Sequence, residues 1–250
     1  MNPERERILR EMGLGPVWKL RVPQAAVPCE QVAAAPVVTL PTVAPDQPAA
    51  GTIPVAASAW DDLARMVATC RQCGLCEARK QAVLGVGDRN ADWLFVGEGP
   101  GAEEDARGEP FVGQAGKLLD SMLAAIRLRR GESVYIANAV KCRPPGNRTP
   151  EAAEMAACRP WLERQIALLQ PKVIVLLGKA AVHSLLHDDK SLASLRGKRF
   201  AYQGIPVVIT YHPAYLLRNL PEKAKAWEDL LFARRCLREA MAAGSGELSF

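Results

Sequence analysis

Short apolar runs alternate with longer amphipathic stretches along most of this chain. Four runs of six or seven residues predict buried strands, at 92–98, 134–140, 172–178 and 205–210. Five stretches have the spacing of amphipathic helices, at 59–69, 114–128, 150–170, 179–187 and 221–243. Strands that alternate with helices predict parallel pairing with helices on both faces. The expected fold is therefore an α/β protein, a three-layer α/β/α sandwich with a central four-stranded parallel sheet.

The first 58 residues have a different composition. They are rich in Ala, Val and Pro, and nine of the 19 prolines precede residue 59. Proline interrupts both helices and sheets, so residues 1–58 are predicted to be a largely disordered extension of a folded domain at 59–245. A short apolar set at Ile8–Leu14 is either a docking element for a partner or part of a variable tail.

Charge and hydrophobicity narrow the class of protein. Hydrophobic residues make up 49% of the 250 residues, and the whole net charge of +5 falls after residue 59. A mildly basic domain is compatible with a polyanionic partner. No apolar run has the length of a membrane span, and the N-terminus lacks the apolar segment of a signal peptide. We therefore expect a cytoplasmic protein that is not bound to a membrane.

Four of the seven cysteines fall into two pairs about 70 residues apart. Cys70 and Cys73 form a C-x-x-C motif, and Cys142 and Cys158 follow later in the chain. Cytosolic thiols stay reduced, so metal ligation is a better explanation than disulfides. Four thiolates suit either a tetrahedral zinc ion or an iron–sulfur cluster. The remaining cysteines lack such a pairing, and they are Cys29, Cys76 and Cys236.

Polar residues gather where the predicted strands end. Glu98 lies in a GEGPG turn after the first strand, Asn138 lies in the second, and His212 follows the fourth. The carboxyl ends of parallel strands meet at one edge of a sheet, where ligands bind, so these side chains predict a catalytic site. The turn lacks G-x-G-x-x-G spacing and contains a carboxylate, which disfavours phosphate binding. His183 and His187 lie within a predicted helix and are interpreted as structural.

Three segments together resemble the motifs of family 4 uracil-DNA glycosylases, the iron–sulfur type. These segments are GEGPGAEEDARGEPFVGQAGKLL, NAVKCRPPGNRTP and TYHPAYLLR, and the resemblance covers about residues 60–240. It implies an enzyme of base excision repair that flips uracil out of single- or double-stranded DNA and hydrolyses its N-glycosidic bond, leaving an abasic site. Such an enzyme is expected to be a monomer associated with the nucleoid, and its N-terminal extension to bind a repair or replication partner. It also implies a [4Fe–4S] cluster on Cys70, Cys73, Cys142 and Cys158, with a structural role. Zinc remains the chemical alternative.

The resemblance also implies roles for residues of the site. Asn138 is expected to bond O4 and N3 of uracil, Phe111 to stack on the flipped base, and His212 to donate to O2 of the departing uracil. Glu98 is expected to orient or activate water, or to stabilise the oxocarbenium-like sugar. Four further residues are expected to bind or shape the base pocket, and they are Gly99, Glu104, Asp105 and Asn147.

The segment after His212 is expected to contact DNA. Leu216 or Leu217 would fill the vacated base position, and Arg218 would contact phosphate. The alternative is that both leucines simply begin the last helix. A competing function is a non-catalytic iron–sulfur module that binds uracil-DNA or senses redox state. Colour separates the metals, because an iron–sulfur protein is brown and absorbs at about 400 nm whereas zinc is colourless.

Overall fold

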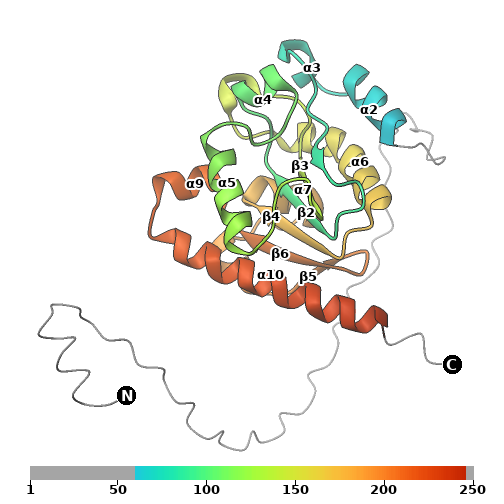
Figure 1. Cartoon of the computed structure of the whole chain (residues 1–250). Helices are drawn as coiled ribbons and strands as arrows, with labels where there is room; N and C mark the ends of the chain where they lie inside the picture. The colour runs from blue at the N-terminus through green and yellow to red at the C-terminus, as the bar shows by residue number, and fades with distance from the viewer. Residues whose placement is uncertain (1–59, 246–250) are drawn as a thin grey trace, which may run out of the picture. The chain divides into compact units, whose positions relative to one another are not determined.

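A six-stranded mixed sheet forms the centre of the computed structural model, which describes residues 60–245 (Figure 1). The strands are β1 (Val86–Gly87), β2 (Trp93–Gly97), β3 (Val134–Asn138), β4 (Val173–Leu177), β5 (Phe200–Tyr202) and β6 (Ile205–Thr210). Their spatial order is β1-β3-β2-β4-β6-β5. The four predicted strands form its parallel middle, and β1 and β5 pair antiparallel at the two edges.

The expected sheet of four parallel strands is therefore incomplete. β1 has only two residues, too few for a hydrophobic pattern to reveal it. β5 is the first arm of a hairpin with β6, turned at Gln203 and Gly204, which both have left-handed φ angles. The second arm of this hairpin was predicted as the strand at 205–210, whereas β5 was not predicted as a strand.

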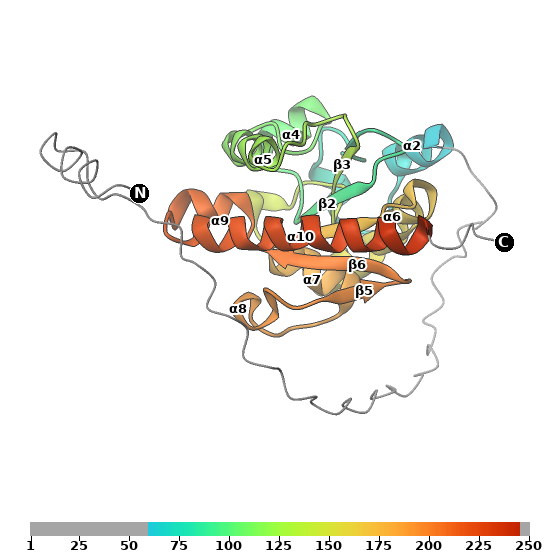
Figure 2. The same ribbon diagram turned by 60° about the horizontal axis from the view of Figure 1, so that its bottom comes forward.

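Helices cover both faces of the sheet, and the side chains of each strand alternate between them. Leu94 and Val96 of β2 face a core shared with α6 (Ala152–Leu169), α7 (Lys179–Leu186) and α8 (Leu192–Leu195). Trp93 and Phe95 face the opposite core, shared with α5 (Gln114–Ala125) and α10 (Glu222–Ser245). Figure 2 shows α10 running along the sheet next to β6. This is the expected layering.

Several helix ends differ from the sequence prediction. α6 begins at Ala152 with Glu151 as its cap, two residues later than predicted. α5 ends at Ala125, because Arg127 adopts a left-handed φ of 62°. α9 (Pro213–Arg218) is a helix of its own, separate from α10. The remaining helices are α2 (Trp60–Thr69), α3 (Leu75–Ala78), α4 (Ala102–Arg107) and the 3₁₀ turn at Pro145–Asn147.

Predictions for residues 1–58, including the Ile8–Leu14 element and Cys29, lie outside the described residues. Among residues 60–245, no helix combines the length and the apolar character needed to cross a membrane. The domain boundary at residue 59 and the monomeric state stay predictions.

Candidate active site

A cavity of about 770 Å³ opens at the carboxyl ends of the parallel strands. Glu98, Asn138 and His212 all line it, as the parallel-strand rule predicted. The chain holds the ends of β2 and β3 together beyond the sheet: Ala139 donates its N–H to the Gly97 carbonyl at 2.9 Å. The three predicted strand-end residues thus belong to one pocket.

Asn138 is the most deeply buried polar group of this pocket. It is 2% exposed, and its Oδ1 has no hydrogen-bond partner in the structure. Asn138 lies opposite Gly97 in the β2–β3 register, and a Cβ on Gly97 would lie 2.5 Å from Oδ1. Glycine at 97 therefore leaves room for the amide. A buried acceptor without a partner costs free energy unless a ligand satisfies it.

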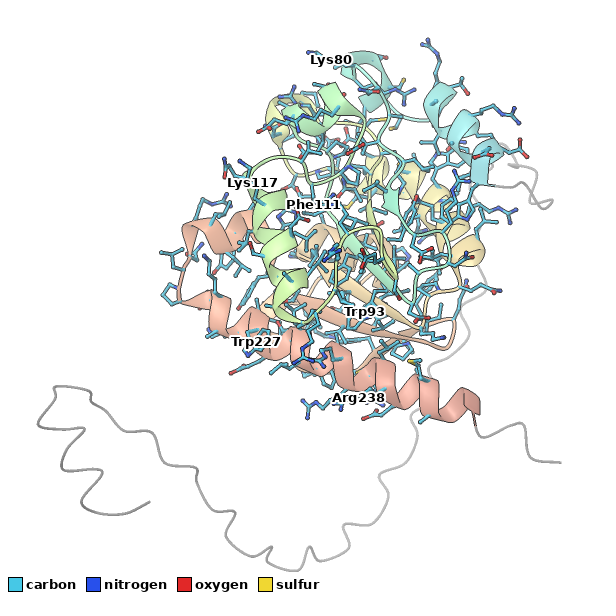
Figure 3. The ribbon with its side chains drawn as sticks, in the orientation of Figure 1. Lys80, Trp93, Phe111, Lys117, Trp227 and Arg238 are labelled. Carbon is cyan, nitrogen blue, oxygen red and sulfur yellow. The ribbon has the colours of Figure 1, made fainter. Side chains whose placement is uncertain are left out.

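Phe111 forms one wall of the pocket. Its ring lies 5.4 Å from the His212 ring, with an interplanar angle of 29°. The residue is only 6% exposed, so its ring belongs to the interior of the domain and not to an exposed turn. The turn lies just before α5, beside which Figure 3 labels Phe111, and the ring lines the cavity. A buried ring beside an open cavity offers a stacking surface to a planar ligand.

His212 is held in a defined protonation state. It caps α9, and its Nδ1 accepts the Ala214 N–H at 3.2 Å. Burial, with a smaller contribution from the charge of Arg218, lowers the pKa of His212 to about 4. The neutral ring therefore carries its proton on Nε2, because Nδ1 is an acceptor. Nε2 is the donor that remains for a ligand.

Glu98 lies in the turn after β2 and is half-buried. Burial raises the pKa of its carboxyl group, while a hydrogen bond with the Thr149 side chain acts in the opposite direction. Thr149 lines the same cavity. Thr149 therefore orients the Glu98 carboxylate.

Glu104 and Asn147 line the cavity, but both have partners in the protein. The Glu104 carboxylate accepts three backbone N–H groups, from Gly101, Val112 and Gly113, at 2.9–3.1 Å. The Asn147 amide oxygen accepts from Arg143 at 2.7 Å. Glu104 thus joins the GEGPG turn to the Phe111 turn.

The other two residues expected at the base pocket differ in position. Gly99 lines the cavity, and a Cβ there would lie 2.7 Å from Val140. Asp105 does not line it: this buried side chain accepts the Lys80 N–H at 2.9 Å. The structure therefore places Asp105 away from the base pocket, where it fastens α4 to the preceding segment.

The segment expected to contact DNA divides into a buried and an exposed part. Leu216 is 1% exposed and packs with Tyr211 and Ala226, whereas Leu217 is 41% exposed. Arg218 lines the cavity. Of the two leucines, Leu217 is the one presented on the surface.

Five cysteine side chains line one small pocket beneath α2 and α3. They are the four predicted ligands, Cys70, Cys73, Cys142 and Cys158, together with Cys76. Cys142 and Cys158 are buried, and they pack with Leu63, Leu75 and Trp161 in a separate core. The structure thus brings the two sequence pairs together and adds a fifth thiol.

The donors of this pocket fit an iron–sulfur cluster, which binds through thiolates. Burial raises the pKa of Cys158 to about 12, so its thiolate needs a strong cation nearby. Two donors already point at sulfur: Arg79 Nη1 lies 2.9 Å from Cys142 Sγ, and the Lys141 N–H lies 3.2 Å from Cys158 Sγ. Within the described residues, no group of three or more ligands has a ready-made metal geometry. The match between this pocket and an iron–sulfur cluster therefore rests on the chemistry of the cysteine sulfurs.

Sequence reasoning missed the side chains that support these sites. Lys141 is 1% exposed, and its ammonium donates to the Asn138 carbonyl at 2.7 Å and to the Gln165 amide oxygen at 2.5 Å. Arg79 was also overlooked. The sequence holds one local signal of this burial. Lys141 stands between Val140 and the predicted ligand Cys142, at the end of a buried strand, where a charged residue is rare.

The described residues thus form a three-layer α/β domain with an open cavity at its strand ends and a cluster of thiols beside it. The family model described as "Uracil DNA glycosylase superfamily" matches residues 84–231. The chain belongs to this superfamily, and its resemblance to the family 4 enzymes is confirmed.

Three relatives illustrate the similarity, and each is named a Type-4 uracil-DNA glycosylase. The protein from Thermotoga maritima is 48% identical over 155 residues, which is 61% of this chain and 80% of the relative. That from Archaeoglobus fulgidus is 43% identical over 165 residues, 63% of this chain and 82% of the relative. That from Saccharolobus solfataricus is 40% identical over 190 residues, 73% of this chain and 86% of the relative.

Proposed function

We propose that this protein is a uracil-DNA glycosylase of base excision repair. It binds uracil flipped out of DNA in the strand-end cavity and hydrolyses the N-glycosidic bond, leaving an abasic site. The observation that carries the proposal is the Asn138 side chain, a buried amide whose oxygen has no partner beside an open cavity.

Base recognition follows from the donors and acceptors of that amide. Asn138 Oδ1 accepts the N3–H of uracil, and its Nδ2 donates to O4. In the same orientation cytosine presents an unprotonated N3 and an amino group, so both contacts mismatch. Phe111 supports the base by stacking on its face, next to the His212 ring.

His212 stabilises the departing base. Negative charge develops on O2 of uracil as the glycosidic bond breaks, and the Nε2–H of the neutral imidazole donates to that oxygen. The low pKa of His212 keeps the ring neutral at physiological pH, and the Ala214 N–H fixes which nitrogen donates. The contact strengthens as charge builds up, so it lowers the barrier and not only the dissociation constant.

Glu98 acts on the sugar side of the bond. Its carboxylate, oriented by Thr149, orients the attacking water and stabilises the oxocarbenium-like sugar. Bond cleavage transfers the bonding pair to uracil, and water adds to C1′ of the sugar. The water proton leaves through the Glu98 carboxylate.

DNA is held at the mouth of the cavity. Lys179 and Arg218 line the cavity and are suited to phosphate contacts. Leu217 is exposed beside them and would fill the space that the flipped base vacates. Leu216 anchors the α9 segment from below.

The cofactor in this proposal is a [4Fe–4S] cluster held by Cys70, Cys73, Cys142 and Cys158. When bound, it supplies a structural cross-link and no redox step, because hydrolysis requires none. Cys142 and Cys158 hold opposite ends of the segment that contains Asn147 and Thr149, so the cluster would order this wall of the pocket.

Uracil excision by the purified full-length chain tests the function. The protein should convert uracil-containing oligonucleotides, single- or double-stranded, to alkali-labile abasic sites without added cofactor. Absence of product from both substrates would contradict the proposal. The variant Asn138→Asp should reduce discrimination between uracil and cytosine, whereas Asn90→Asp, at an exposed position in the turn before β2, should leave it unchanged.

A further inference from the structure

The Phe111 turn adopts a conformation that residues with a side chain rarely hold. Phe111 has a φ of +56°, in the left-handed region. The first turn of α5 lies directly against it, because a Cβ on Gly116 would lie 1.7 Å from the Phe111 carbonyl oxygen. Such a conformation persists only where neighbouring contacts hold it in place.

Arg130 supplies contacts to two successive carbonyl groups of this turn. Its Nη1 donates to the Pro110 oxygen and its Nη2 to the Phe111 oxygen, each at 2.9 Å. The guanidinium is itself held by Asp120 of α5, with Nε and Nη2 at 3.1 and 2.9 Å from one carboxylate oxygen. The planar fork of arginine suits these simultaneous contacts, which a lysine ammonium cannot reproduce.

The other side of the turn is held by Glu104, which accepts the next two N–H groups, those of Val112 and Gly113. Three successive peptide groups, from the Pro110 carbonyl to the Gly113 N–H, are thus bound by two charged side chains of opposite sign. The Phe111 ring between them faces the cavity and the His212 ring. Charged hydrogen bonds from both sides leave the backbone of the turn little freedom to relax.

We propose that Arg130 is a positioning residue for base recognition, which holds the Phe111 turn so that the ring meets the flipped base. The proposal deepens the uracil-DNA glycosylase function and rests on it. Arg130 does not line the cavity, so it acts through Phe111 and not on the substrate. Without it the left-handed turn relaxes, and the stacking surface shifts from its place beside His212.

Enzyme kinetics on a uracil-containing oligonucleotide test this role. Arg130→Met should lower kcat/KM by about 10-fold or more, mainly through a higher KM, because a stacking ring contributes to binding of both substrate and transition state. Arg130→Lys, which keeps the charge but not the fork, should show an intermediate loss. The matched control is Arg129→Met, since this neighbouring exposed arginine pairs with Glu132 and should change kcat/KM by less than about 2-fold.

A double-mutant cycle separates positioning from a general effect on stability. In a Phe111→Ala background, Arg130→Met should change kcat/KM by less than about 2-fold, because the residue through which Arg130 acts is gone. Calorimetric titration with free uracil repeats the cycle without catalysis. An equal loss in both backgrounds, or no loss in the wild-type background, overturns the proposal. If Arg130→Met does not fold, Arg130→Lys replaces it in the cycle, and the same comparison of kcat/KM in the wild-type and Phe111→Ala backgrounds tests the proposal.

The two proposals fail in distinguishable ways. A wild-type protein that removes no uracil from DNA overturns the function itself. A wild-type protein that removes uracil, combined with additive effects of Arg130 and Phe111, overturns only the positioning role.

Discussion

Acidification should destabilise the protein through His212. The folded state keeps this ring neutral down to a pKa of about 4, whereas an ordinary histidine titrates at 6.5. The unfolded chain therefore takes up a proton as the pH falls below 6.5, and the folded protein does not follow until about pH 4. The contribution of His212 to stability is complete above pH 6.5 and is lost as the pH falls towards 4.

The size of this effect follows from the two pKa values. Between pH 7.5 and pH 4.5 the linkage amounts to about 2.5 kcal/mol of unfolding free energy. His212→Asn removes the titrating ring but keeps a side chain that can cap α9. The difference in stability between wild type and variant should therefore move by about 2.5 kcal/mol, in favour of the variant at acidic pH.

Urea unfolding of both proteins at a series of pH values measures this difference. Both carry the same cysteine pocket, so its own acid sensitivity cancels. NMR titration of the imidazole gives the pKa directly. A stability difference that stays constant with pH, or an imidazole that titrates near 6.5, would show that the ring is not held neutral and would remove the basis for its role as a neutral donor.

Two further predictions concern the support of the site. Lys141→Met removes the ammonium that donates to the Asn138 carbonyl and to the Gln165 amide oxygen, and the loss should lower the free energy of unfolding in urea by about 2–5 kcal/mol. The control Lys80→Met, at an exposed position, should change it by less than about 0.5 kcal/mol. Cys158→Ser should abolish the brown colour and the absorption at about 400 nm, and Cys76→Ser should retain both. Loss of colour in the Cys76 variant would mean that the ligand set was assigned wrongly.

The central strands could be predicted because each is buried on both faces. An uninterrupted apolar run marks such a strand, and the predicted fourth strand, 205–210, has the bounds of β6. The edge strands have no such apolar run. β1 has two residues, and its pairing depends on β3, which lies about 50 residues further along the chain. Short-range patterns record burial but not long-range pairing.

The site divides in the same way. Glu98, Asn138 and His212 were predictable together because parallel strands bring their carboxyl ends to one edge. Arg130 was not predictable, since its role depends on a carbonyl 19 residues earlier in the chain, reached only after α5 has folded back. No local pattern distinguishes it from Arg129 beside it.

The residues that support the pocket differ in kind from those that would contact the base. Glu104, Arg130 and Lys141 are charged, and each directs its charge at backbone groups of the strand ends and turns around the pocket. Asn138 and His212 keep a polar atom for a ligand: Oδ1 has no partner, and Nε2 remains as the donor because Nδ1 is used. Because buried polar atoms are normally satisfied, such atoms persist only where the backbone beneath them is held by other contacts. Removal of a supporting charge should therefore impair uracil recognition without any loss of a direct contact to the base.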